Sequence, residues 1–185
     1  MPIIIDLLGS WIIRASLITV MLTLTVTLNN TLYQSNVQAT AKQRIVAVDS
    51  IIYSDLNMAG YNVSGTTFQV AADTLRRFWG DVNGGGVQDD VRYMALYDST
   101  TGLRKLYRYV NNENGGKDLL LGSNFKTVTF LYYDSNGNQT TTLANIVAVR
   151  VRLTTTVTNA ITKAYSSVTG NYTVTTDFQV HPANL

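Results

Sequence analysis

The sequence predicts an α+β protein, in which a long N-terminal helix packs by its second half on an antiparallel β-sheet. Apolar residues recur at helical spacing as far as Leu56, and Ala59-Gly60 then supplies a helix stop. Beyond Gly60 the apolar residues alternate with polar ones in several runs that turn residues separate, a pattern typical of strands. At 185 residues and 45% hydrophobic content, the chain has room for one globular head plus an appendage.

Residues 1–30 are expected to form an exposed apolar helix. Asp6 and Arg14 are the only charges among the first 41 residues. A helix that is apolar around its whole circumference belongs in a bilayer or in the core of an assembly. About 26 residues at about 1.5 Å each span roughly 39 Å, more than the roughly 30 Å hydrocarbon core of a membrane. The side chains predicted to form this membrane anchor or filament core are Ile3, Ile4, Ile5, Leu7, Leu8, Trp11, Ile12, Ile13, Leu17, Ile18, Val20, Leu22, Leu24, Val26 and Leu28.

A cleaved secretory signal fits this segment less well than a retained helix. A signal has a basic start and roughly 7 to 15 apolar residues, whereas here an acid comes first and the apolar run is about twice as long. Threonines at 19, 23, 25 and 27 add β-branched side chains, which are mildly unfavourable in helices. Two alternatives follow: part of residues 19–28 is extended in an assembly, or the helix is unbroken and the hydroxyls bond to the preceding turn.

Residues 31–60 are expected to continue the helix as an amphipathic segment, which brings its total length to roughly 55 residues and roughly 80 Å. Its apolar stripe consists of Leu32, Val37, Ala41, Ile45, Val48, Ile52 and Leu56. Charged residues between these positions give the helix one polar face. The stripe therefore predicts that this half of the helix packs on something.

Residues 61–185 are expected to form the head, an antiparallel sheet of about five strands. Alternation over 91–97 and 103–109 predicts one hairpin, and runs at 125–133 and 146–153 flank a turn that contains Asn136-Gly137 and predict a second. A last alternating run covers 172–180. The apolar face of such a sheet needs a cover, and the amphipathic half of the helix is the expected one.

Several segments in this order resemble a known family. They include the helix end Asp55-Leu56-Asn57-Met58-Ala59-Gly60-Tyr61 and the hairpin Phe130-Leu131-Tyr132-Tyr133-Asp134-Ser135-Asn136-Gly137. Over roughly residues 45 to 155 the chain is similar to the type IV pilin superfamily, and within it to PilW-type minor pilins and the J-type pseudopilins of type II secretion. The resemblance implies a structural subunit that is held in the cytoplasmic membrane before assembly and then joins a filament at the cell surface. It also implies an assembly machinery with an ATPase motor and, in a pilin, methylation of the N-terminal amine.

Asp6 and Arg14 are the assembly residues that this resemblance suggests. Family members carry a glutamate at the fifth mature position, which pairs with the N-terminal amine of a neighbouring subunit. Asp6 is the fifth residue if Met1 is discounted, so it either fills that role or marks the membrane edge. Arg14, unusual for the family, either extends to the lipid headgroups or pairs with Asp6 of an adjacent chain. The mid-helix proline of many pilins is missing, and we expect the chain to correspond to a mature form without the family's basic leader.

The glycine-rich segment 81–90 is the only candidate for a metal. Asp81, Asn83, Asp89 and Asp90 supply oxygen ligands of the kind that Ca²⁺ prefers. The segment departs from an EF-hand loop, because Arg92 stands where a bidentate glutamate is required. A plain connection between strands is the favoured interpretation, so no cofactor is expected, with Ca²⁺ as the alternative.

Composition argues against an enzyme and against a nucleic-acid binder. The chain has no cysteine and one histidine, His181, and no nucleophile with a base and an orienting group can be named. Net charge is only +2 and 14% of residues are charged, so protein partners are expected rather than polyanions. A minor alternative is adhesion or DNA capture by basic residues of the head, namely Arg104, Lys105, Arg108, Arg150 and Arg152.

The sequence therefore favours a pilin or minor pilin that assembles through its N-terminal helix. Two alternatives remain open: a pseudopilin of type II secretion, and a single-span, membrane-anchored β binding domain that does not polymerise.

Overall fold

The computed structural model describes residues 2–72, 75–111, 113, 115–158 and 171–185, and it describes the backbone but not the side chains at 2–6, 75, 158 and 171. The chain divides into two compact units, Met1–Ala39 and Thr40–Leu185. This boundary lies at residue 39, whereas the sequence suggested a change of environment near residue 30. The second unit, called the head below, contains the end of the helix and all the described strands.

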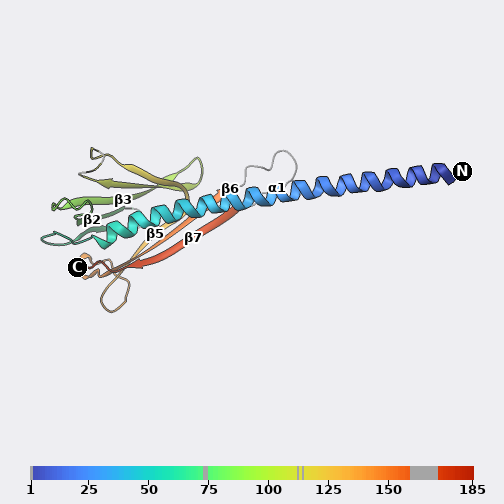
Figure 1. Cartoon of the computed structure of the whole chain (residues 1–185). Helices are drawn as coiled ribbons and strands as arrows, with labels where there is room; N and C mark the ends of the chain where they lie inside the picture. The colour runs from blue at the N-terminus through green and yellow to red at the C-terminus, as the bar shows by residue number, and fades with distance from the viewer. Residues whose placement is uncertain (1, 73–74, 112, 114, 159–170) are drawn as a thin grey trace. The chain divides into compact units, whose positions relative to one another are not determined.

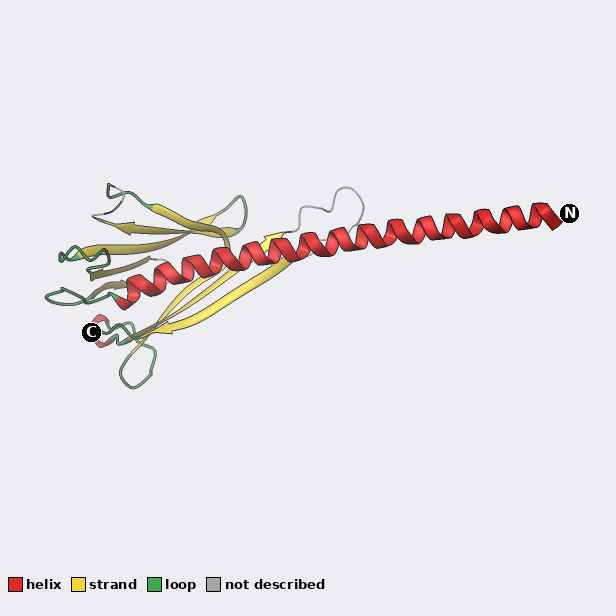
Figure 2. Cartoon of the chain, in the orientation of Figure 1, coloured by secondary structure: helices red, strands yellow, loops and turns green. Residues whose placement is uncertain are grey.

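In the part of the chain that the structure describes, a long helix is followed by the strands of a sheet, and a short 3-10 helix lies between two of these strands (Figures 1 and 2). The elements are α1 (Pro2–Asn57), β1 (Phe68–Ala71), β2 (Leu75–Gly80), β3 (Asp89–Asp98), β4 (Leu103–Val110), β5 (Leu119–Tyr133), η1 (Leu143–Asn145), β6 (Ala148–Thr158) and β7 (Asn171–Val180). The α+β class and the long N-terminal helix predicted from the sequence are confirmed.

The strands form one antiparallel sheet in chain order, β1-β2-β3-β4-β5-β6-β7. Both predicted hairpins are present: Val91 pairs with Val110 through to Asp98 with Leu103, and β5 pairs with β6. The expected strand count of about five was wrong, because β1 and β2 were missed. β1 has four residues and a register shift, and β2 places Arg76 among its core-facing positions, which interrupts the apolar alternation.

The helix ends close to the predicted stop. Gly60 has φ +83°, the left-handed conformation that glycine adopts most easily, and its N–H donates to the Trp79 carbonyl oxygen at 2.9 Å. A Cβ at Gly60 would overlap the carbonyl oxygen of Asn184. Conformation and space therefore both require glycine at this point, where the chain leaves α1 for the sheet.

The amphipathic half of α1 covers the apolar face of the sheet, as predicted. Five stripe positions are buried, namely Ala41, Ile45, Val48, Ile52 and Leu56, and the last four share one core with the inward side chains of the strands. Burial starts at Ala41, since Leu32 is 62% exposed. On β7, Thr176 Oγ1 donates to Asp49 Oδ1 at 3.1 Å, and the Phe178 ring lies 6.2 Å from that of Tyr53. The helix is therefore anchored on the sheet by apolar packing with polar contacts beside it.

Candidate functional site: the apolar segment of α1 and the charged groups of the head

The apolar segment, residues 7–28 of α1, exposes its large side chains on every side. Their exposed fractions run from 45% at Val26 to 71% at Trp11, and neighbours such as Ile12 and Ile13 are equally exposed. Successive positions on a helix point in different directions, so no face of the segment is protected. Side chains of this kind that stay in contact with water are costly, at about 25 cal/mol per Å² of apolar surface.

By length and composition, α1 contains one segment able to cross a membrane. An 18-residue window of the helix has a mean hydropathy of 1.8, and none of that window is buried within the protein. A stretch of this kind is compatible with membrane anchoring. The same property would suit the interior of a helical assembly, because lipid tails and neighbouring apolar helices are similar surroundings.

Most hydroxyl groups of this segment bond within the helix. Five of them, and that of Thr31 just beyond it, donate to the carbonyl oxygen four residues earlier, at 2.8 to 2.9 Å; the five are Ser16, Thr19, Thr23, Thr25 and Thr27. This is the unbroken helix expected as one alternative for residues 19–28. The other alternative concerns an assembled form and stays a prediction. Because the hydroxyls bond within the helix, they add little cost in an apolar medium.

The two predicted assembly residues lie in α1. The Asp6 side chain and those of Ile3, Ile4 and Ile5 lie outside the described part, so a pairing of Asp6 stays a prediction. Arg14 is exposed and lines a groove on the helix together with Gly9, Ser10 and Ile13. A guanidinium on an otherwise apolar segment requires either a carboxylate partner or access to a polar interface.

The loop that contained the calcium candidates is held together by its own hydrogen bonds. Asp81 Oδ2 accepts from Gly86 N at 2.8 Å and from Asn62 Nδ2 at 3.0 Å. Asp89 accepts from Val82 N and from Asn83 Nδ2, each at 3.2 Å.

Asp90, the fourth candidate, forms a bidentate ion pair with Arg77 at 2.8 and 3.0 Å, which raises the pKa of that guanidinium. Among the described residues, no group of three His, Cys, Asp or Glu side chains is placed to hold a metal ion. These carboxylates therefore close and brace the loop, and Ca²⁺ binding stays an untested alternative.

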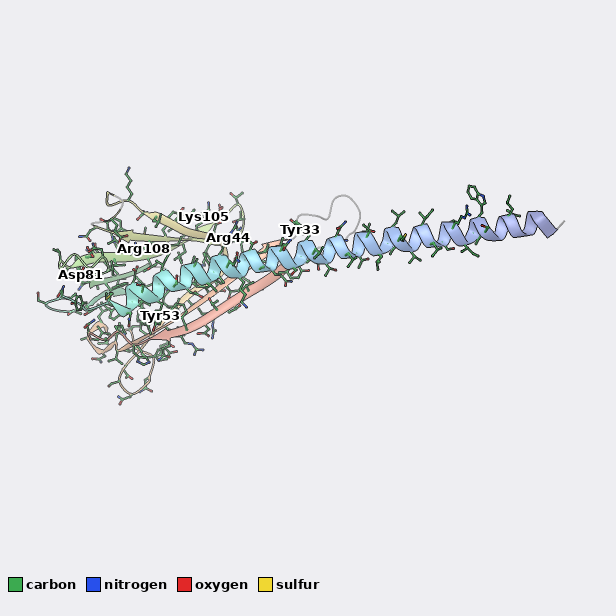
Figure 3. All side chains as sticks on the ribbon, viewed as in Figure 1. Tyr33, Arg44, Tyr53, Asp81, Lys105 and Arg108 are labelled. Carbon is green, nitrogen blue, oxygen red and sulfur yellow. The ribbon has the colours of Figure 1, made fainter. Side chains whose placement is uncertain are left out.

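Sequence reasoning missed a buried polar cluster between α1 and the sheet. Asp55, in the last turns of α1, receives a bidentate pair from Arg108 of β4 at 2.6 and 3.0 Å, and the hydroxyl of Tyr93 of β3 donates to it at 2.5 Å. Arg108 also pairs with Glu113 in the loop after β4. Figure 3 labels Arg108 beside the last turns of α1, with Tyr53 on the other side of the helix.

Burial and charge set the protonation of this cluster, called the Asp55 cluster below. The pKa of Tyr93 is raised well above its usual value, first by burial and then by the carboxylate of Asp55. Burial alone would lower the pKa of Arg108, but its hydrogen bonds to Asp55 and Glu113 outweigh this and raise it. Arg108 therefore stays charged in the interior, where it pairs with both Asp55 and Glu113. The signal available in the sequence was the position of Asp55, three residues after Ile52 and next to Leu56 of the apolar stripe.

The basic residues proposed as a binding surface are mostly neutralised, which weighs against that alternative. Arg108 is buried in the Asp55 cluster, and Lys105 pairs with Asp98 at 3.0 Å. Arg150 and Arg152 share the carboxylate of Asp177, each at 2.7 Å. Four of the five cations therefore have a carboxylate partner within the part of the chain that the structure describes.

The described structure therefore has two main features: an exposed apolar segment in α1, and a head in which the end of α1 packs on the sheet. A comparison with models of protein families found none that matches this chain, and a comparison with curated proteins found no match either. The functional argument accordingly rests on the chain's own residues.

Proposed function

We propose that this protein is a structural subunit of a type IV pilus-like filament, a pilin or minor pilin. Before assembly, the apolar segment of α1 holds the subunit in the cytoplasmic membrane. After assembly, the same segment lies against the helices of other subunits, and the heads form the surface of the filament. The observation that carries the proposal is the contrast within α1: residues 7–28 are exposed on all sides, whereas the stripe from Ala41 to Leu56 is buried in the head.

The energetics of the proposal are consistent with reversible assembly. Moving an apolar helix from lipid into a bundle of similar helices exchanges one apolar environment for another, so the hydrophobic effect favours neither strongly. Moving it into water would expose each of its large side chains, at about 25 cal/mol per Å². Extraction from the membrane then needs external work, which an ATPase motor would supply.

Asp6 and Arg14 take the assembly roles in this proposal. A carboxylate in an apolar core is stable only when paired, so Asp6 binds the N-terminal amine or Arg14 of a neighbouring subunit. The threonine hydroxyls of this segment bond within the helix, so these two charges are the groups that fix the register of adjacent helices.

A second candidate function rests on the same helix. In a membrane-anchored β binding domain that does not polymerise, α1 crosses the bilayer once and stays there. This candidate predicts that neutralising Asp6 changes nothing and that detergent releases monomers. A pseudopilin of type II secretion differs from a pilin in its abundance and in the machinery that it serves, not in the chemistry of α1.

Electron microscopy of material sheared from cells, with mass spectrometry of the same fraction, tests the proposal. Thin filaments made chiefly of this chain would identify a main subunit, and filaments that contain traces of it would identify a minor pilin or a pseudopilin. Recovery of the chain from membrane fractions alone would overturn the proposal in favour of the anchored monomer. Asp6→Asn should abolish incorporation, whereas Asp118→Asn, an exposed position in the head, should leave it unchanged.

A further inference from the structure

The head contains an open cavity of about 410 Å³ on the outer face of the sheet, opposite α1, where β5 and β7 end and β6 begins. Its lining includes Tyr133, Arg150, Gln179 and His181, together with Asp134 from the turn after β5. Arg150 lies directly opposite Gln179 in the β6–β7 register. The volume falls within the roughly 300 to 1,000 Å³ typical of ligand sites. The cavity contains the single histidine of the chain, which the proposed function does not use.

The charges around this cavity cancel. Arg150 and Asp134 line it and carry opposite charges, and Arg152 and Asp177 beside them form an ion pair at 2.7 Å. Arg150 is also held by Asp177, at 2.7 and 2.8 Å, so its guanidinium is fixed in place. The two arginines and the two aspartates therefore sum to no formal net charge that would attract an anion or a cation. This balance favours a neutral ligand.

The site offers both donors and acceptors beside an aromatic ring. Gln179 Nε2 lies 2.9 Å from His181 Nε2, and this contact orients both side chains while leaving other polar atoms of each to bind. Asp134 Oδ1 accepts from the N–H groups of Asn136 and Asn138 at 2.9 Å, so Oδ2 is the oxygen left to accept from a ligand. Tyr133 adds an apolar ring face with a polar end.

We infer that this cavity binds a neutral sugar residue. A hexose has hydroxyl groups that both donate and accept, which suits Gln179, His181, Arg150 and Asp134, and it has an apolar C–H face, which suits the ring of Tyr133. A purely apolar ligand would leave these polar groups unpaired at a cost, and a charged one would meet no net opposite charge. Because the cavity lies in the head and not on the apolar segment of α1, the inference does not depend on filament assembly.

Saturation-transfer difference NMR with the full chain tests this inference. The chain is placed in a detergent that lacks a sugar headgroup, since maltosides would compete. Glucose, galactose, mannose and N-acetylglucosamine are each added at millimolar concentration, with glucuronate as an anionic comparison. At least one neutral sugar should receive saturation, strongest at the C–H groups of one ring face. The absence of transfer to all four neutral sugars, or transfer to glucuronate alone, would overturn the inference.

Matched variants place the binding in this cavity. The double variant Gln179→Ala with His181→Ala changes two exposed side chains, so the fold should be retained, and the affinity for the sugar should fall about tenfold or more. Thr173→Ala, at an exposed position of β7 outside the cavity, should bind as the unaltered chain does. Equal binding by the double variant would show that the sugar binds elsewhere, and the inference would be wrong.

Discussion

The two parts of α1 are continuous in sequence and in helical structure, yet their apolar residues meet different surroundings. In the head, the stripe from Ala41 to Leu56 is between 0% and 5% exposed. In residues 7–28 the large apolar side chains are 45% or more exposed. The head part is covered by residues of the same chain, whereas the large apolar side chains of the other part are left exposed by the described residues, a state compatible with membrane anchoring. The stability of the head therefore depends on one part of α1, and the proposed function depends on the other.

The largest loss of stability in the head should come from a substitution in the Asp55 cluster. Arg108→Ala leaves the buried carboxylate of Asp55 without its bidentate partner, and an uncompensated buried charge typically costs about 3 to 5 kcal/mol. Denaturant unfolding of the head should show a loss of this size. Arg104→Ala, in the same strand and without a described carboxylate partner, should change the free energy of unfolding by less than about 0.5 kcal/mol.

A second variant separates charge from packing in that cluster. Replacing the three groups together, with Asp55→Leu, Arg108→Met and Tyr93→Phe, removes the buried charges and the hydroxyl that would otherwise lose its acceptor, and it should recover much of the stability that Arg108→Ala loses. If the triple variant is no more stable than Arg108→Ala, the ion pair is not what holds the end of α1 on the sheet.

Matched truncations in the two parts of α1 test the comparison directly. Ile52→Ala opens a cavity at a fully buried position and should destabilise the head by about 2 to 5 kcal/mol. Ile12→Ala removes the same atoms at a position that is 67% exposed, so the melting temperature of the head in detergent should not change. A similar loss in both variants would mean that residues 7–28 also stabilise the head.

The sequence predicted the helix, both hairpins and β7 because their periodicity and turn residues act locally. The same reasoning missed β2, where Arg76 faces inward and its guanidinium carbon lies 4.0 Å from the centre of the Phe130 ring. It also missed the Asp55 cluster, because Asp55 and Arg108 are separated by 53 positions and only the folded register brings them together. Local patterns predict elements, whereas charges that meet across elements depend on the tertiary structure.

On the outer face of the sheet, which α1 does not cover, an ion pair should make a smaller contribution to stability, and this contribution should depend on pH. The hydrogen bond from Arg150, with help from Arg152, lowers the pKa of Asp177 to about 2, against 3.8 for the ordinary side chain. Its contribution to stability is therefore present above pH 3.8 and is lost as the pH falls towards 2. Because the pair is exposed, Asp177→Asn should lower the melting temperature at pH 7 by only about 2 °C or less. The variant and the unaltered chain should converge near pH 2, and a difference that persists there would show a role other than charge.

The smallest expected effect has the opposite sign and lies in the head part of α1. Burial raises the pKa of Asp49, and the hydrogen bond from Thr176 offsets this only in part. A raised carboxyl pKa means that the folded state disfavours the charged form, so this residue costs stability once the pH is above its folded pKa. Asp49→Asn keeps an oxygen to accept from Thr176 and removes the charge, so it should raise the melting temperature at pH 7 by about 1 °C.

Lowering the pH should remove this difference, because Asp49 then becomes protonated in the folded state and matches the neutral variant. Asp98→Asn is the natural comparison, since Lys105 lowers the pKa of Asp98 and the same substitution there should be slightly destabilising at pH 7. Scanning calorimetry at pH 7 and pH 3 gives the melting temperatures of both variants and of the unaltered chain, and hence the sign of each change. If Asp49→Asn were destabilising at pH 7, the hydrogen bond from Thr176 would outweigh burial, and the anchoring of α1 on β7 would be polar at this point rather than apolar.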